Sequence, residues 1–372
     1  MTTKKSLIIH LITILLCLVH ALNAQTNITV GEKHVITSTY LNEERTIQVS
    51  VPDNYEPDAK KYPVLYLLDG QRFFLYGVSL QQSFQQFKLT PDFIVVGINN
   101  SYPQRFRHFS ETVKFKGFIE RELVPFVESQ YSTSADHLLF GWEYAGAFSL
   151  DLLNSNENEF SAYFLASPFP ITQKRLDKTD SIFNSLYNKT RLLYFTVSEF
   201  ENQVNEGVNE LISVLKRTDN ANWKFELLPN ESHRSTPYHT IYDGLCNYYF
   251  NYPELQFATL AEYREKGGLP YVYEYYQQRS ERFDFPNNIT SWTKFSLIRN
   301  AVRADDLDEF VMLMEEFNDQ EFLKHINERR IKTLADYYVH KELKREAHVL
   351  ARDFLKLHPE SDLIKEFLKK LK

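Results

Sequence analysis

Short, continuous apolar runs recur along the chain as far as residue 228, and such runs are typical of strands buried on both faces of a sheet. Between several of them, apolar residues recur every three or four positions, most clearly at 117–131 and 204–216, which predicts amphipathic helices. A preceding stretch, in which Ile47, Val49 and Val51 alternate with polar residues, predicts a half-exposed strand. This alternation favours an α/β fold, a doubly wound, mostly parallel sheet with its ligand site at the carboxyl ends of the strands. The buried runs lie at 64–68, 93–96, 138–140, 163–166, 192–195 and 225–228.

The strand pattern stops near Pro253, and helical periodicity continues to the C-terminus. A first apolar stripe, which we expect Asp305 to cap, is repeated at a constant offset by a second stripe. The repetition resembles a pair of tetratricopeptide-like helical hairpins, and a helical appendage packed on the sheet domain is an equal alternative. The matching pairs are Leu313 with Leu350, Met314 with Ala351, and Phe317 with Phe354.

The N-terminal residues differ from the rest of the chain, because two lysines precede an apolar run at 7–19. This arrangement predicts a signal peptide that is cleaved after Ala24, and therefore a secreted or periplasmic protein. The alternative, a membrane anchor, needs about 20 apolar residues, and the run is shorter. Because Cys17 lies in the leader, Cys246 is left alone and no intrachain disulfide is expected. The predicted divisions are a leader at 1–24, a sheet domain at 25–252 and a helical region at 253–372.

Composition narrows the possible classes of function. The chain is 43% hydrophobic, 24% charged and 15% aromatic, which is typical of a folded protein with a packed core and an aromatic-lined cleft. Its formal net charge of -7 and its dispersed lysines and arginines give no electrostatic reason to expect nucleic acid. Ten of the 11 histidines, all except His233, show no paired spacing with cysteine or carboxylate, so we expect neither a metal site nor another cofactor.

The segment GWEYAG at 141–146 has the form of a nucleophile elbow that carries a glutamate in place of the serine. In such an elbow a buried strand turns sharply into a helix, and small residues on both sides of the turn expose the central side chain. The flanks agree, because a short apolar run precedes the segment and a helical pattern with an apolar face follows it. The chemistry of the site therefore depends on Glu143.

Five sequence blocks resemble the putative esterase family of α/β-hydrolases, which includes S-formylglutathione hydrolase, the mycolyltransferases and the enterobactin-type siderophore esterases. The resemblance covers residues 29–249 and does not select a substrate. It implies an α/β-hydrolase fold for the sheet domain and a small-molecule ester or glycan as the ligand. The blocks are YPVLYLLDG at 62–70, FIERELVPFV at 118–127, Ala166-Ser167-Pro168, ESHRS at 231–235 and YDGL at 242–245.

Catalytic roles carry over from the family by position. The nucleophile, acid and histidine of α/β-hydrolases follow one another along the chain, and candidates occur here in that order, each after a predicted strand. The resemblance implies that Glu143 replaces the nucleophile and that His233 is the general base. Glu201 or Glu199 would orient the imidazole, and because both lie in one acidic loop the sequence does not choose between them.

Binding roles carry over in the same way. The backbone N–H groups of Tyr144 and of Gly70 or Gln71 would form the oxyanion hole. Arg105 and Arg107 match a loop in which siderophore-esterase relatives keep arginines for anionic substrate groups. The alternative is that both arginines balance nearby acids.

A glutamate cannot copy the chemistry of serine. A fixed carboxylate about 4 Å from a developing oxyanion repels it by roughly 4 kcal/mol at an effective dielectric of about 20, near a thousandfold in rate. The nearest other hydroxyls in the sequence are Ser149, deep in the predicted helix, and Ser167. Three hypotheses follow: a hydrolase that uses Glu143 as nucleophile or as base for a water, a pseudo-esterase that binds an ester, glycan or siderophore without turnover, and a protein whose C-terminal helices bind a partner protein.

Overall fold

The computed structural model describes residues 28–155, 160–183, 191–217 and 222–371. The predicted leader at 1–24, with its cleavage point and Cys17, lies outside these ranges. The chain divides into two compact units, of which the first comprises Met1–Gln82 and Asp92–Ile241, and the second Ser83–Pro91 and Tyr242–Lys372. Within the described ranges, no helix is both long enough and apolar enough to span a membrane.

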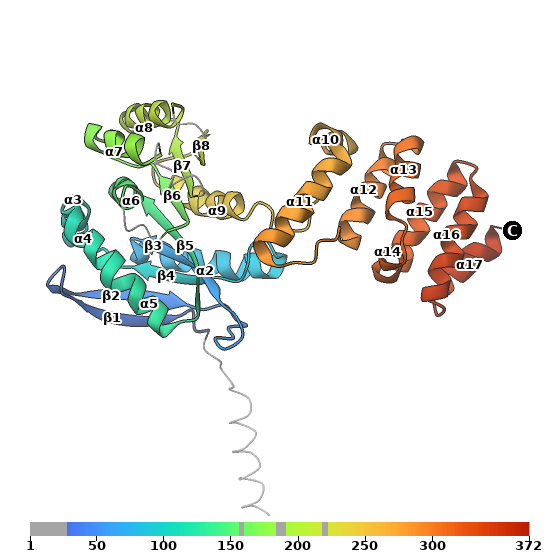
Figure 1. The fold of residues 1–372 in the computed structure, drawn as a ribbon, viewed down its shortest axis with the longest axis horizontal. Helices are drawn as coiled ribbons and strands as arrows, with labels where there is room; N and C mark the ends of the chain where they lie inside the picture. The colour runs from blue at the N-terminus through green and yellow to red at the C-terminus, as the bar shows by residue number, and fades with distance from the viewer. Residues whose placement is uncertain (1–27, 156–159, 184–190, 218–221, 372) are drawn as a thin grey trace, which may run out of the picture. The chain divides into compact units, whose positions relative to one another are not determined.

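The described part of the first unit is built on one eight-stranded sheet with the order β1-β2-β4-β3-β5-β6-β7-β8 (Figure 1). β1 pairs antiparallel with β2, and β2 with β4, whereas every other neighbouring pair is parallel. The predicted α/β fold with a mostly parallel sheet is thus confirmed. The strands are β1 Glu32–Ser38, β2 Glu43–Ser50, β3 Tyr62–Leu68, β4 Ile94–Ile98, β5 Thr133–Trp142, β6 Ala162–Ala166, β7 Leu192–Ser198 and β8 Trp223–Leu228.

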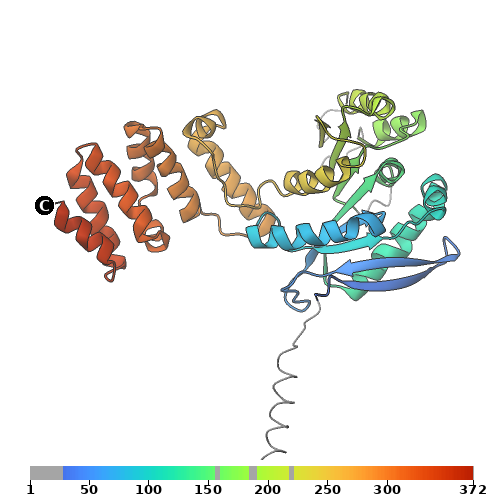
Figure 2. The ribbon, with the colours of Figure 1, turned by 180° about the vertical axis from the view of Figure 1, so that it is seen from behind.

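Burial explains why these runs form strands. β3, β4, β6 and β7 are buried along their whole length, which is what continuous apolar runs between two layers of helices require. β2 buries Ile47 and Val49 and keeps Thr46 and Gln48, which alternate with them, partly accessible. The β1–β2 hairpin, blue in Figures 1 and 2, forms one edge of the sheet and β8 forms the other.

Helices cover both faces of this sheet. Helices α2 and α9 lie on one face, where the rings of Phe73 and Tyr238 meet edge to face at 6.1 Å, and α4 to α8 lie on the other (Figures 1 and 2). The helix expected at 204–216 is α8, and the one expected at 117–131 is α4 and α5 joined by a π-helical turn at Ile119–Leu123. The bounds are α2 Gly70–Phe87, α3 Gln104–Ser110, α4 Thr112–Phe118, α5 Val124–Gln130, α6 Tyr144–Leu153, α7 Gln173–Phe183, α8 Asn202–Leu215 and α9 Thr236–Tyr248.

The strand order reverses between β3 and β5. The chain leaves β3 for β4 on one side and then returns across β3 to form β5 on the other. Ligands of open α/β sheets bind where the strand order reverses in this way. Asp69 directly follows β3 and Glu143 directly follows β5, so both residues lie at this switch point.

The second unit is helical in its described residues beyond Tyr242, and buried side chains of consecutive helices form one core, which includes Leu313, Phe317, Leu350 and Phe354. The predicted cap was wrong by one position. Asp306, not Asp305, accepts from the backbone N–H of Glu309 at the start of α13, because Asp305 has a φ of 55° and pairs with Lys341 at 2.6 Å. The helices are α10 Leu260–Glu265, α11 Gly268–Phe283, α12 Ser291–Arg303, α13 Leu307–Phe317, α14 Gln320–His325, α15 Glu328–His340, α16 Lys344–Leu357 and α17 Asp362–Lys370.

Candidate active site

Glu143 occupies a strained turn between β5 and α6. Its φ of 58° and ψ of −118° are unusual for any residue other than glycine, and such a conformation costs of order 1–3 kcal/mol. Backbone hydrogen bonds hold it in place: its N–H donates to the carbonyl of Ala166 at 3.0 Å, and its carbonyl accepts from the N–H groups of Ala147 and Phe169 at 3.0 and 3.1 Å. A Cβ on Gly141 would lie 2.5 Å from the Ala145 carbonyl oxygen, which is why glycine precedes the turn.

The Glu143 side chain forms an ion pair with Arg105. Arg105 Nη1 lies 3.2 Å from Glu143 Oε2, and Arg105 Nη2 also donates to the carbonyl of Trp142 at 3.3 Å. The same guanidinium binds both carboxylate oxygens of Asp69, with Nε at 2.9 Å from Oδ1 and 3.0 Å from Oδ2. Asp69 is fully buried, whereas the Glu143 side chain is 27% exposed. Two carboxylates therefore share one guanidinium at the switch point.

The electrostatics of this cluster keep Arg105 charged. Burial by itself would lower the pKa of Arg105, but its bonds to Asp69 and Glu143 outweigh burial and raise that pKa. Complete burial raises the pKa of Asp69, and the Arg105 guanidinium opposes this shift. The Arg105 guanidinium also lies 5.3 Å from the Phe109 ring centre and 5.7 Å from that of Trp142, so its remaining surface faces aromatic rings.

His233 and Glu201 form the second half of the site. His233 Nδ1 hydrogen-bonds Glu201 Oε1, and the other Glu201 oxygen accepts from Ser167 Oγ at 2.7 Å and from the backbone N–H of Ser198 at 2.9 Å. Burial would raise the pKa of Glu201, but these hydrogen bonds, with that of His233 the strongest, lower it. Glu201 thus orients the imidazole as an ionised carboxylate, and Nε2 of His233 forms no hydrogen bond with a described residue.

Trp142, which the sequence reasoning did not select, positions His233. Its ring lies 4.8 Å from the imidazole, centre to centre, and its Nε1 donates to the His233 carbonyl at 3.0 Å. Trp142 is the residue before Glu143, so the histidine is beside the elbow. Among the described residues, the side chains of Glu143 and His233 form no hydrogen bond or ion pair with each other. In the sequence, the position of Trp142 next to the elbow was the only signal that could have identified it.

Two of the predicted site residues, Glu199 and Arg107, make contacts elsewhere. Glu199 accepts from the backbone N–H of Asn230 at 2.7 Å, so Glu201 and not Glu199 is the carboxylate on His233. Arg107 pairs with Glu43, with its side chain half exposed, and does not join Arg105 at Glu143.

The backbone groups expected to form an oxyanion hole lie at two helix starts. Tyr144 begins α6, and Gly70 and Gln71 begin α2, and these helices follow the neighbouring parallel strands β5 and β3. First-turn N–H groups have no acceptor within their own helix, so they are available to a bound oxygen. The Gln71 side chain fixes the α2 start by bonding both backbone groups of Asn100 at 2.9 Å.

Neither serine close in sequence replaces the missing nucleophile. Ser149 is fully buried and its hydroxyl donates to the carbonyl of Ala145 at 2.9 Å. Ser167 is also buried, and its hydroxyl is held by Glu201 and by Thr236 Oγ1 at 2.8 Å. Within the ranges that the structure describes, no group of three or more His, Cys, Asp and Glu side chains could hold a metal ion.

Comparison with known proteins finds one relative by sequence and several solved structures with a similar fold. The chain is 32% identical over 159 residues to the uncharacterized protein YjcH of Bacillus subtilis (strain 168), a match that covers 39% of this chain and 64% of that protein, less than two thirds of its length. An IroE-like serine hydrolase from Shewanella oneidensis has a similar fold, with a TM-score of 0.55 and 21% identity over 77% of this chain and 98% of that one. The siderophore hydrolase EstB from Aspergillus nidulans also has a similar fold, with a TM-score of 0.52 and 18% identity over 60% of this chain and 97% of that one.

The family model described as putative esterase matches residues 38–239, which is more than half of the chain. These residues contain the switch point, the elbow with Glu143, and the His233–Glu201 pair. The chain therefore belongs to the putative esterase family of α/β-hydrolases.

Proposed function

We propose that this protein is derived from carboxylic ester hydrolases and that its ester site binds an ester, without efficient turnover of simple esters. The observation that carries the proposal is the Arg105 ion pair of Glu143, a carboxylate at the position of the family's nucleophile. The family membership supports an ester as the ligand, and the backbone N–H groups at the starts of α2 and α6 would receive its carbonyl oxygen.

Charge is the reason for the low turnover. Ester hydrolysis by a serine passes through an oxyanion, and a carboxylate near that oxygen opposes it. Arg105 does not cancel this effect, because Asp69 already binds its Nε and Nη2 atoms. Because two carboxylates share this guanidinium, Glu143 keeps negative charge beside the oxyanion position, while Ser149 and Ser167 are engaged in buried hydrogen bonds.

A second candidate is a hydrolase with altered chemistry, in which Glu143 acts as nucleophile or as base for a water. The retained pair of His233 and Glu201 favours it. Ser167 and Ser198 hold the Glu201 carboxylate, and Glu201 in turn holds the His233 imidazole in a fixed orientation, as proton transfer in an active site requires. The two candidates differ in the fate of a bound ester.

A screen of purified protein against a panel of siderophore, acyl and glycan esters tests both candidates. Thermal shift would report binding, and release of acid would report turnover. We expect at least one ester class to raise the unfolding temperature while acid release stays near the uncatalysed rate. Turnover that Glu143→Gln abolishes would instead establish the second candidate. Neither binding nor turnover of any ester would remove the support for a ligand in this site.

Export and partner binding complete the proposal. The lysines and the apolar run at 7–19 support a signal peptide, and we expect the mature chain to begin near Gln25 in a secreted or periplasmic fraction. N-terminal sequencing of that fraction tests this, and an intact Met1 on a membrane-bound product would refute it. The helical second unit would serve as a surface for a protein partner, as stacked helical hairpins do.

A further inference from the structure

A pocket of about 440 Å³ lies beside the elbow in the first unit and is lined by α3, α4, α6 and α7 with the loop before α7. Tyr144, the residue after Glu143, is one of its walls, and its ring also faces the Arg105 guanidinium at 6.0 Å. The pocket therefore adjoins the proposed ester site through one aromatic side chain. Its volume is in the range of small-molecule sites, about 300–1,000 Å³.

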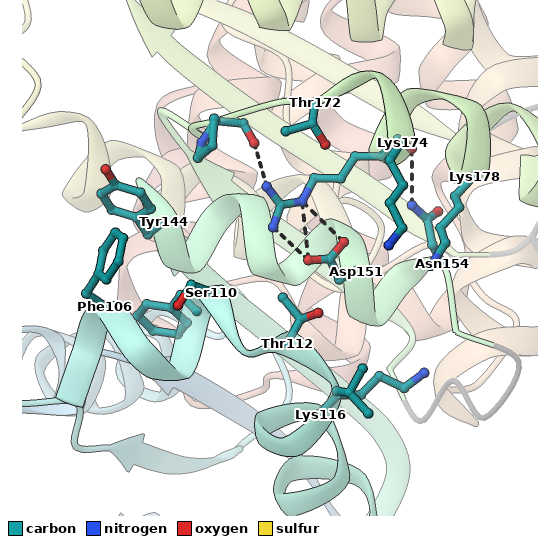
Figure 3. Close-up of a pocket in the computed structure, with 14 residues that line it drawn as sticks. Phe106, Ser110, Thr112, Lys116, Tyr144, Asp151, Asn154, Thr172, Lys174 and Lys178 are labelled. Atoms are coloured by element: carbon teal, nitrogen blue, oxygen red, sulfur yellow. Dashed lines mark hydrogen bonds and ion pairs between the residues drawn. The ribbon is translucent and has the colours of Figure 1, made fainter.

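One end of the pocket is aromatic and the other is cationic. Figure 3 shows Phe106 and Tyr144 at one end and Lys174 and Lys178 at the other, with Asp151 between them. The rings of Phe106 and Tyr144 pack edge to face at 5.6 Å. Phe106 is nevertheless 56% exposed, which leaves apolar surface at the mouth of the pocket for a ligand to cover.

The cationic end of the pocket contains one arginine with an ion-pair partner and several lysines without one. Arg175 is committed to the structure, because it binds Asp151 with Nη2 at 2.7 Å from Oδ2 and donates to the carbonyl of Pro170 at 2.6 Å. Lys116, Lys174 and Lys178 also line the pocket, and within the described chain none of their side chains forms a hydrogen bond or ion pair. Three unpaired lysines around one pocket stand out in a chain with a net charge of -7.

We propose that this pocket binds a small amphipathic anion, a phosphate monoester whose aromatic or acyl body rests on Phe106 and Tyr144 and whose phosphate lies between the lysines. Lysine binds phosphate as a point charge, and a dianion can engage more than one ammonium group. The inference deepens the proposed function, on which it rests, by giving the ester ligand an acidic group. A volume of about 440 Å³ accommodates a ligand of this size.

The experiment measures binding by isothermal titration calorimetry to the full mature chain. The probes are 1-naphthyl phosphate, which has both the ring and the dianion, inorganic phosphate, which has only the dianion, and 1-naphthol, which has only the ring. We expect 1-naphthyl phosphate to bind at least tenfold more tightly than either fragment. Because the lysines are accessible to solvent, its affinity should fall several-fold between about 0.05 and 0.5 M salt.

Variants assign the binding to this pocket. Lys174→Ala with Lys178→Ala should weaken 1-naphthyl phosphate at least tenfold, and Phe106→Ala should reduce its advantage over inorganic phosphate. The matched control is Lys33→Ala with Lys61→Ala, which removes two exposed lysines outside the pocket and should change the affinity less than twofold. Equal losses in the two lysine double variants, or no preference for 1-naphthyl phosphate over its fragments, would overturn the inference.

Failure of this inference can be told apart from failure of the proposed function. The binding measurement requires no catalysis, and a thermal shift by a neutral ester requires no anion pocket. Absence of both a thermal shift and turnover with every ester of the panel, while 1-naphthyl phosphate still binds through the lysines, would leave the pocket standing and remove the support for an ester ligand. Absence of 1-naphthyl phosphate binding would overturn the pocket, whatever the esterase assays show.

Discussion

Replacing Glu143 with serine is expected to create hydrolysis of p-nitrophenyl acetate, at least tenfold above that of the wild type. The substitution restores a hydroxyl at a turn whose backbone geometry is already that of a nucleophile elbow. It also removes one of the two carboxylates on Arg105 and leaves a balanced Arg105–Asp69 pair. The retained His233–Glu201 pair supplies the base.

The size of the gain follows from the geometry. A unit charge about 4 Å from the oxyanion costs roughly 4 kcal/mol at an effective dielectric of about 20. Arg105 at 3.2 Å and the 27% exposure of the Glu143 side chain reduce this repulsion in the wild type. A tenfold gain corresponds to about 1.4 kcal/mol, so the expectation holds even when only about a third of the repulsion acts on the transition state.

The assay compares initial rates of the wild type, Glu143→Ser, Glu143→Gln, and Glu143→Ser combined with His233→Ala. Glu143→Gln is the matched control, because it removes the same charge without adding a nucleophile, so its rate should stay well below that of Glu143→Ser. The combined variant should lose the new activity, since no base remains to accept the serine proton. Circular dichroism and thermal unfolding of each variant would establish that the fold is kept.

Two results would refute this reasoning. An active wild type whose rate falls in both Glu143→Ser and Glu143→Gln would identify the carboxylate as the working group. No activity in folded Glu143→Ser would mean that the serine hydroxyl and the His233 imidazole are not brought together, and that the site no longer supports serine chemistry.

Three further predictions concern the framework of the site. Arg105→Ala should destabilise the fold by about 3–5 kcal/mol in urea unfolding, because Asp69 is left buried without its partner. Arg107→Ala removes a half-exposed side chain and should cost about 0–1 kcal/mol, and equal costs for the two variants would contradict the buried pairing of Arg105. Because the pKa of Glu201 is lowered in the fold, its ionised form stabilises the protein at neutral pH, and the destabilisation by Glu201→Gln should shrink as the pH falls below the carboxyl's ordinary 4.5. A difference in unfolding free energy between wild type and variant that does not change with pH would contradict this prediction. Gly141→Ala should cost about 1–3 kcal/mol in the same urea assay, since its Cβ would lie 2.5 Å from a backbone oxygen, and an unchanged midpoint would contradict that packing.

Local patterns in the sequence were enough to predict the sheet and the elbow. Continuous apolar runs such as 64–68 and 192–195 became fully buried strands, because a strand covered on both faces excludes polar side chains. The elbow was equally readable, since Gly141 is required by close contact with the following helix. Caps were less certain: Asp305 and Asp306 are chemically identical, and only the backbone conformation of each decides which accepts from the helix.

Contacts between residues far apart in the chain were decided by the tertiary structure. Glu199 and Glu201 cannot be distinguished in the sequence, and Glu201 meets His233 because the ends of β7 and β8 are adjacent in the sheet. Likewise nothing local joins Arg105 to Glu143. That ion pair exists because the chain crosses from β4 back over β3 to β5, which brings α3, the helix after β4, and the elbow to one switch point. Residue type and spacing therefore determined the elements and their order, whereas packing of the sheet determined which charges meet, because ion pairs form through space and not along the sequence.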